Sequence, residues 1–143
     1  MDVSYLPYAV LAMAAYTFVS PLMRLATTGP DAVPSDVAVI VSNALLIGIA
    51  VSVVWYTDQG FSTHLSSPKL SYVLVAGVFL AVGILALYRA LSLGPVSVVT
   101  PIFALFLVFS SLIGVVLLGE SFSTRKALGI GFAVVSVYLV SGA

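Results

Sequence analysis

The stretch YRALSLGPVSVVTPIFALFLVFSSLIGVVLLGE, residues 88–120, decides how the chain folds. No charged side chain lies between Arg89 and Glu120, and this is too long for one membrane-spanning helix of about 20 residues. The pair Gly94-Pro95 divides the stretch, because glycine favours the end of one helix and proline the first turn of the next. The stretch therefore predicts two apolar helices joined by a very short turn.

The composition of the whole chain is that of a membrane protein. Hydrophobic residues make up 62% of it and charged residues 7%, against about 25% charged residues in soluble domains. In water such a chain would expose large apolar patches, so we place it in a lipid bilayer. Its net charge of zero argues against a nucleic-acid partner. Its lack of cysteine excludes disulfides and thiol chemistry.

Charged residues divide the chain into five apolar segments, which we interpret as five transmembrane helices in a single domain, 1–143. The first is expected to be a permanent span, because it is longer than a signal-peptide core and is preceded by Asp2. Ser35 or Asp36 is expected to cap the second helix and Ser123 the fifth. The predicted helices are about 4–25, 36–57, 70–92, 96–118 and 124–142.

The five cations are almost evenly divided between the two ends of these helices. Lys69, Arg125 and Lys126 lie on the side of the N-terminus, and Arg24 and Arg89 on the opposite side. This small bias favours a cytoplasmic N-terminus. The near-balance has two interpretations. Either copies insert in both orientations and form an antiparallel dimer, the two-chain form of an inverted repeat, or so few cations look balanced by chance.

Pro101 lies more than one turn inside the fourth predicted helix, where proline removes a backbone hydrogen bond. In lipid such freed groups find partners in other helices, in hydroxyl side chains or in water, and Ser97 and Thr100 are near enough to help. Small or weakly polar residues form one stripe here: Ser97, Pro101, Ala104, Val108 and Ser111. The stripe is either a close contact between helices or one wall of a central cavity.

Three segments carry a resemblance to a known family: YRALSLGPVSVVTPI at 88–102, LLGE at 117–120 and KALGIGFAVVSVYLV at 126–140. Their order and spacing resemble the EamA-type domain of the drug/metabolite transporter superfamily, over roughly residues 76–142. The first helix departs from the family, whose members often have Trp-Gly near its middle, where this chain has Tyr16-Thr17.

The resemblance implies a unit of five helices. Many family members fuse two such units, in opposite orientations, around a central substrate cavity, whereas this chain carries one unit. It is therefore expected to pair with a second copy, or with a related partner, as one half of a transporter bundle. The related small multidrug exporters have a buried glutamate in helix one. Here no acid lies between Asp2 and Arg24, which argues against proton-coupled export of cations.

Eight residues are candidates for a solute pocket. Asn43 is strongly polar for lipid, so it is expected either to bond a neighbouring helix or to line the pocket. Tyr88 is expected at the cavity mouth or in the interfacial belt of aromatic residues. His64 is expected to be a solvated loop residue. The pocket candidates are Tyr16, Ser20, Asn43, Tyr88, Ser97, Thr100, Pro101 and Ser111.

Four further residues are expected to shape the turns: Gly94, Pro95, Gly119 and Glu120. Glu120 is either a buried proton site or, the interpretation we favour, a partner of the last helix's N-terminus, of Arg125 or of Lys126. Arg89 either extends to the interface or binds an anionic group, and Arg24 is similar. The last helix has small residues four apart, which allow close approach of another helix. We expect the dimer contact there, at Ala127, Gly129, Gly131 and Ala133.

Transport of a small metabolite or drug-like solute by alternating access is the function that these observations favour. The chain is expected in the plasma (inner) membrane, without cofactor or metal, and no enzyme activity is expected because acids and the one histidine do not cluster. Two other functions stay open. One is an accessory or structural membrane subunit, and the other is a subunit of a lipid-linked sugar flippase.

Overall fold

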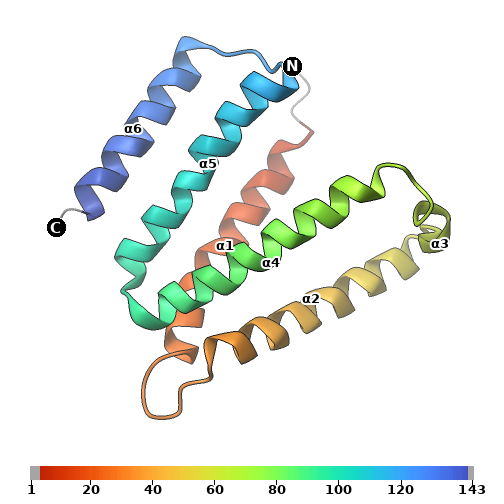
Figure 1. Cartoon of the computed structure of the whole chain (residues 1–143), viewed down its shortest axis with the longest axis horizontal. Coiled ribbons are helices and arrows are strands. Elements are labelled where there is room, and N and C mark those ends of the chain that lie inside the picture. Colours follow the sequence, from red (N-terminus) through yellow and green to blue (C-terminus); the bar gives the residue numbers. More distant parts are fainter. Residues whose placement is uncertain (1–3, 142–143) are drawn as a thin grey trace. The chain divides into compact units, whose positions relative to one another are not determined.

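The computed structural model describes residues 4–141, which are all-helical (Figure 1). The long helices begin and end within two residues of the predicted ranges, and residue 142 lies outside the described part of the chain. The short helix α3 lies in a segment predicted to be a loop, and His64 is its last residue. The helices are α1 (Leu6–Ala26), α2 (Ser35–Tyr56), α3 (Phe61–His64), α4 (Leu70–Leu93), α5 (Val96–Leu118) and α6 (Thr124–Ser141).

The helix starts test two of the predicted caps. The expected cap on α2 is wrong: its N-cap is Pro34, with no side-chain cap, because Ser35 is already the first helical residue and its hydroxyl points to Asp36 at 3.4 Å. The expected cap on α6 is confirmed, because the amide of Lys126 donates to Ser123 Oγ at 3.3 Å.

The chain divides into two compact units between Leu93 and Gly94. The Gly94-Pro95 pair was predicted to separate two helices, and it does lie between α4 and α5. Pro95 is the N-cap of α5, with φ −69° and ψ 144°, an extended conformation that proline favours. Gly94 does not have a positive φ, so it separates the helices without a left-handed cap.

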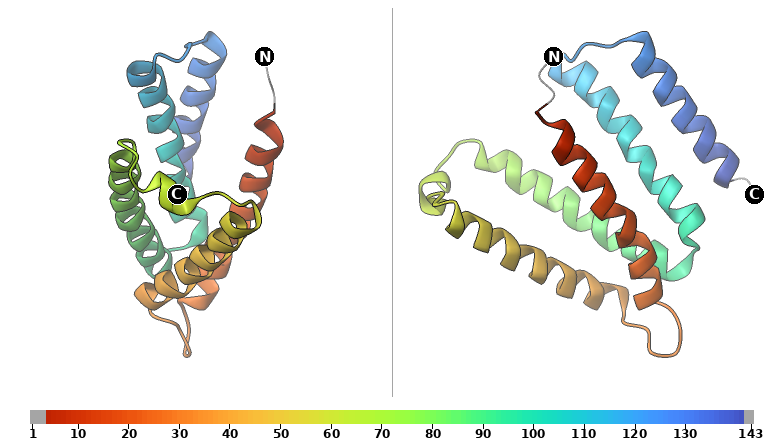
Figure 2. Two further views of the ribbon diagram at one scale, coloured as in Figure 1. Left: turned by 90° about the vertical axis from the view of Figure 1, so that its right-hand side faces the viewer. Right: turned by 180° about the vertical axis from the view of Figure 1, so that it is seen from behind.

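In the first unit, α4 packs against both α1 and α2 (Figure 1, Figure 2). The buried residues of this unit lie where the end of α1, the start of α2 and the end of α4 meet. The packed part of the unit is therefore at one end of the helices. These residues are Ser20, Thr27, Ser35, Ala38, Leu87, Tyr88 and Leu91.

In the second unit, α5 and α6 pack as an antiparallel hairpin (Figure 1). Gly119 ends α5 with φ 68° and ψ 25°, a left-handed conformation that glycine adopts without steric cost. The amide of Glu120 donates to the carbonyl of Gly114 at 3.2 Å and satisfies part of the helix end. The left-handed backbone at position 119 thus explains why glycine occurs at this turn.

Large apolar side chains are exposed along all the long helices. Trp55 is 86% exposed and Phe132 is 73% exposed. Water would disfavour so much apolar surface, whereas lipid chains would not. Four helices of the described chain, α1, α2, α4 and α5, are long and apolar enough to cross a membrane. The protein is therefore an all-helical integral membrane protein.

Candidate functional site

A polar cluster joins α2 and α4 in the first unit. Tyr88 is buried, with 4% of its surface exposed, and its hydroxyl lies 3.4 Å from Ser42 Oγ. Ser42 has one hydroxyl proton and donates it to the carbonyl of Val39 at 3.2 Å, so Tyr88 is the donor in the bond between the helices. Tyr88 is thus a buried residue that packs against α2 within the first unit.

Asn43 belongs to the same cluster but does not bond another helix. Its amide Nδ2 donates to the carbonyl of Val39, on its own helix, at 2.8 Å. Val39 therefore accepts from both Ser42 and Asn43, and the two side chains are held on α2 by one carbonyl. In this arrangement the Ser42 oxygen is left to accept the hydrogen bond from the Tyr88 hydroxyl.

Arg24 joins the end of α1 to the end of α4. Its Nη1 donates to the carbonyl of Leu91 at 2.7 Å, and the contact is partly buried. Leu91 lies in the last turn of α4, where carbonyls have no partner within the helix, and it is 0% exposed. Arg24 therefore satisfies a carbonyl that water does not reach, and its guanidinium lies at the negative end of the α4 dipole.

The two candidates on α1 have different surroundings. Ser20 is buried, with 8% of its surface exposed, whereas Tyr16 is 69% exposed. Ser20 lies in the half of α1 that contributes to the packed end of the unit, and Pro21 follows it inside the helix. The first unit thus brings Ser20 and Tyr88 into its packed end, holds Asn43 on α2 nearby and leaves Tyr16 outside.

The four candidates of the second unit all lie on α5. Thr100 and Pro101 are partly buried, and Ser97 and Ser111 are exposed. Ser111 donates to the carbonyl of Leu107 at 2.8 Å. Pro101 lies inside the helix, as predicted. Thr100 Oγ1 is buried without a hydrogen-bond partner.

The α5–α6 turn holds the expected ion pair of Glu120. Lys126 Nζ lies 3.7 Å from Glu120 Oε2 and donates to the carbonyl of Ser121 at 2.9 Å. A Cβ at Gly114 would lie 3.3 Å from three atoms of the Glu120 carboxylate, so the carboxylate lies directly over this glycine. Both charged side chains are about half exposed. The geometry is that of a structural contact at the turn.

A hollow of about 330 Å³ lies beside this turn, between α5 and α6. Its lining combines the Glu120–Lys126 pair with apolar side chains and with the pocket candidate Ser111. The lining residues are Ser111, Val115, Glu120, Phe122, Lys126, Gly129 and Ile130.

The small residues of α6 are largely uncovered by the rest of the chain. Gly129, Gly131 and Ala133 are exposed, and Ala127 is partly buried. A Cβ built on Gly129 or Gly131 would meet no atom within 4 Å. These residues form two pairs on different sides of α6, Ala127 with Gly131 and Gly129 with Ala133, and another helix could approach either pair closely.

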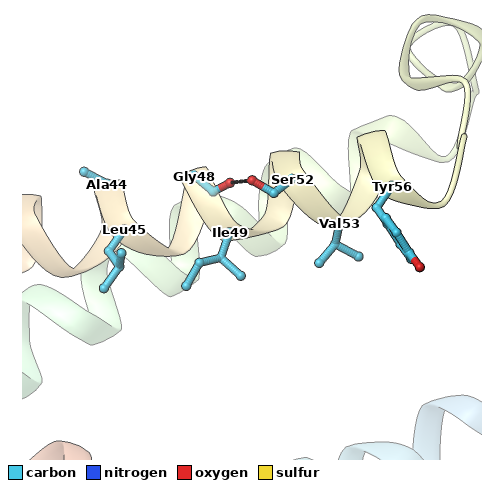
Figure 3. A pocket seen from close by; sticks show the side chains of 7 residues that line it. All are labelled: Ala44, Leu45, Gly48, Ile49, Ser52, Val53 and Tyr56. Atoms are coloured by element: carbon cyan, nitrogen blue, oxygen red, sulfur yellow. Dashed lines mark hydrogen bonds between the residues drawn. The ribbon is translucent and has the colours of Figure 1, made fainter.

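A larger hollow, of about 590 Å³, lies along α2 and contains none of the pocket candidates (Figure 3). All of its lining comes from α2, and Leu45, Ile49 and Val53 point to the same side of the helix. Ser52 donates to the carbonyl of Gly48 at 2.9 Å and is therefore satisfied. One helix face cannot enclose a solute, so this hollow is apolar surface of the kind that lipid covers.

Sequence reasoning did not select Ser42 as a candidate, and for Arg24 it considered the interface or an anionic group but not a bond to another helix. Ser42 is weakly polar and, by itself, resembles the other serines of the helices. Its neighbour Asn43 was the available signal, because two adjacent polar residues in an apolar helix indicate a polar contact. No group of three or more His, Cys, Asp or Glu that could hold a metal ion occurs within residues 4–141.

The comparisons with known proteins agree with this architecture. The model of the EamA-like transporter family matches residues 3–142. A protein of Sinorhizobium sp. named "Uncharacterized transporter in cobO 3'region" is 29% identical over 132 residues, which cover 91% of this chain and 93% of that protein. No solved structure matches the chain. Because the family match spans all the long helices, the chain belongs to the EamA-like transporter family.

Proposed function

We propose that this chain moves a small uncharged or amphipathic solute across the membrane by alternating access, as an antiparallel pair of five-helix units. The observation that carries the proposal is the match of the EamA-like transporter family over residues 3–142, which supports a transport role for this chain. The Sinorhizobium relative is named a transporter and is matched over 93% of its length. EamA-like transporters are generally not enzymes, and we propose no reaction.

The fifth span in this proposal is α6. It has 18 residues and begins with Thr124, Arg125 and Lys126, so its first turn is charged and its apolar part is shorter than that of the other long helices. Cations at the end of a spanning helix can extend to the interface. With α6 inserted, the two termini lie on opposite sides, and a second copy in the opposite orientation completes an inverted repeat.

The class of solute is inferred from the polar groups of the helices. Inside the long helices these are hydroxyl and amide groups, such as Ser20, Asn43, Tyr88 and Thr100, whereas the charged side chains lie near the helix ends. An ion in lipid needs an opposite charge or water, which these residues do not supply. Hydroxyls and amides do suit a neutral polar group.

The dimer contact in this proposal is made by the small residues of α6, in the plasma (inner) membrane. The exposed positions of Gly129, Gly131 and Ala133 support it, because close approach of two helices is how small residues promote association in lipid. A homodimer is the simplest assembly, and a related chain in the opposite orientation would serve equally.

Topology is the first test. Because the chain has no cysteine, Ser66→Cys and Ala32→Cys each provide a single thiol, at opposite ends of α2 and both exposed. Each variant is labelled with a membrane-impermeant maleimide in intact cells and again after lysis. Partial labelling of both variants in intact cells supports two orientations of one chain. Complete labelling of one variant and none of the other contradicts the antiparallel homodimer.

Transport itself is tested in proteoliposomes. The vesicles are given a defined mixture of neutral, cationic and anionic metabolites, and their contents are measured by mass spectrometry. Protein-free vesicles are the control. We expect uptake of a neutral member above that control. Equal contents in both kinds of vesicle, with the protein correctly inserted, would contradict the transport proposal.

A further inference from the structure

Hydroxyl side chains on the described helices, or just beyond their ends, commonly donate to a helix carbonyl three or four residues earlier. The hydroxyl of Thr17 donates to Met13 at 2.9 Å, and that of Thr57 to Val53 at 2.7 Å. This bond, three or four residues back, satisfies a hydroxyl without a second helix. Such a bond matters in lipid, where no water is present to pair with a free polar group. The same pattern occurs at Thr27, Thr28, Ser52, Ser92 and Ser111.

Thr100 departs from this pattern. Within residues 4–141, its Oγ1 is the buried side-chain polar atom that has no hydrogen-bond partner. The carbonyls of Val96 and Ser97 lie four and three residues earlier, at the spacing that the other hydroxyls use. A buried hydroxyl without a partner is unfavourable, so its occurrence here needs a physical reason.

The next residue, Pro101, removes the usual helical donor to a neighbouring backbone carbonyl. Proline has no N–H, so the carbonyl of Ser97 cannot receive the helical bond from position 101. Thr100 and Ser97 are three residues apart and therefore share one face of α5. This face thus holds a hydroxyl that can donate or accept and a carbonyl that can accept.

The surroundings of these two groups in the sequence are uncharged. Residues 90–119 contain no Asp, Glu, Lys or Arg. A charged ligand group on this face of α5 would have no opposite charge on the helix, and its transfer from water would be costly. A neutral group with a donor and an acceptor would satisfy both the hydroxyl and the carbonyl.

We infer that the Thr100 hydroxyl and the Ser97 carbonyl form a hydrogen-bonding subsite on α5 for a neutral hydroxyl or amide group of the solute. This inference rests on the proposed function. Because Thr100 Oγ1 is covered in this structure, the subsite is reached when the face opens, as alternating access requires. Pro101 has a specific role in it, since it keeps the Ser97 carbonyl free of a helical partner.

The test uses the absence of cysteine. Ala104→Cys places a thiol one turn beyond Thr100 on the same face, and leaves the subsite intact. Ile102→Cys is the matched control at nearly the same depth, about 200° around the helix from Thr100 and exposed. Each variant, in membranes, is treated with trimethylammonioethyl methanethiosulfonate, which reacts with thiolates in contact with water. Nicotinamide and erythritol serve as neutral probes, and choline and acetate as charged probes.

We expect the thiol of Ala104→Cys to react about tenfold faster than that of Ile102→Cys, because only the former meets water. A neutral probe should slow this reaction saturably, and a charged probe should not. Adding Thr100→Val, which removes the hydroxyl, or Pro101→Ala, which restores an N–H to the Ser97 carbonyl, should abolish the protection. Thr100→Ser should keep it, which shows that the loss does not come from misfolding.

Three results would overturn the inference. They are equal reaction rates at the two positions, protection by charged probes as strong as by neutral ones, and protection that survives Thr100→Val. Lack of protection by either neutral probe would also remove the assigned ligand class. No transport is measured in this experiment. Failed uptake in proteoliposomes with intact protection would therefore contradict the proposed function and leave the subsite standing.

Discussion

Replacement of Arg24 by methionine tests whether the packed end of the first unit depends on one hydrogen bond. Methionine keeps the length and the apolar stem of the side chain but cannot donate. In the native chain Arg24 Nη1 donates to the carbonyl of Leu91 at 2.7 Å. After the substitution this carbonyl, in the last turn of α4, has neither a helical partner nor access to water, because Leu91 is 0% exposed.

The expected loss follows from these facts. A hydrogen bond from a charged donor contributes about 1.5–3 kcal/mol, and an unsatisfied buried carbonyl costs about 1–3 kcal/mol. These are two descriptions of the same loss and are not added. We therefore expect Arg24→Met to lower the free energy of unfolding by about 2 kcal/mol, which corresponds to about a 30-fold change in the equilibrium constant.

The assay is unfolding by sodium dodecyl sulfate from mild detergent micelles. The single tryptophan, Trp55, lies on α2 in the same unit and reports the transition by its fluorescence. Arg89→Met is the matched control, because Arg89 is also a cation near the end of α4, is exposed, and makes no side-chain hydrogen bond or ion pair within residues 4–141. Its substitution should change the free energy by less than about 0.5 kcal/mol.

Equal losses for Arg24→Met and Arg89→Met would refute this reasoning. They would mean that both cations act through the membrane interface or through net charge, and that the bond to Leu91 contributes nothing of its own. A loss confined to Arg24→Met, and independent of salt concentration, would support a partly buried bond, since surface charge effects are screened by salt.

Three further substitutions test single contacts in the same titration. Tyr88→Phe removes the donor of a 3.4 Å bond, so it should cost about 1 kcal/mol or less, and a much larger loss would show that the hydroxyl has another role. Gly119→Ala puts a side chain on a residue with φ 68° and should cost about 1–2 kcal/mol, whereas Gly77→Ala, whose Cβ would meet nothing within 4 Å, should be neutral or stabilising. Glu120→Gln removes a half-exposed ion pair with Lys126 and should change stability by less than about 1 kcal/mol, and a larger change would indicate a buried role for the carboxylate.

The spans of the long helices could be predicted from the sequence because the signals for them are local. A charge is costly in lipid, so the apolar segments between charges mark the helices. Gly94-Pro95 marks the division between two of them, and α4 does end at Leu93 and α5 begin at Val96. The α6 cap at Ser123 was predictable for the same reason, because a cap involves residues only three apart.

The candidate site was less predictable, because its contacts join residues far apart in the chain. Ser42 and Tyr88 are 46 residues apart, and Arg24 and Leu91 are 67 residues apart. Whether such residues meet depends on how each helix is rotated and where it crosses its neighbour. Hydropathy carries little of this information, since both faces of a membrane helix are apolar.

The sequence by itself determined that this protein is a membrane protein of apolar helices, where those helices begin and end, and which family it resembles. Only the tertiary structure decided that Tyr88 is buried against α2, that Arg24 satisfies the last turn of α4, and that Thr100 Oγ1 has no partner. The physical reason is that insertion into lipid depends on the composition of each segment, whereas hydrogen bonds and packing depend on geometry between segments.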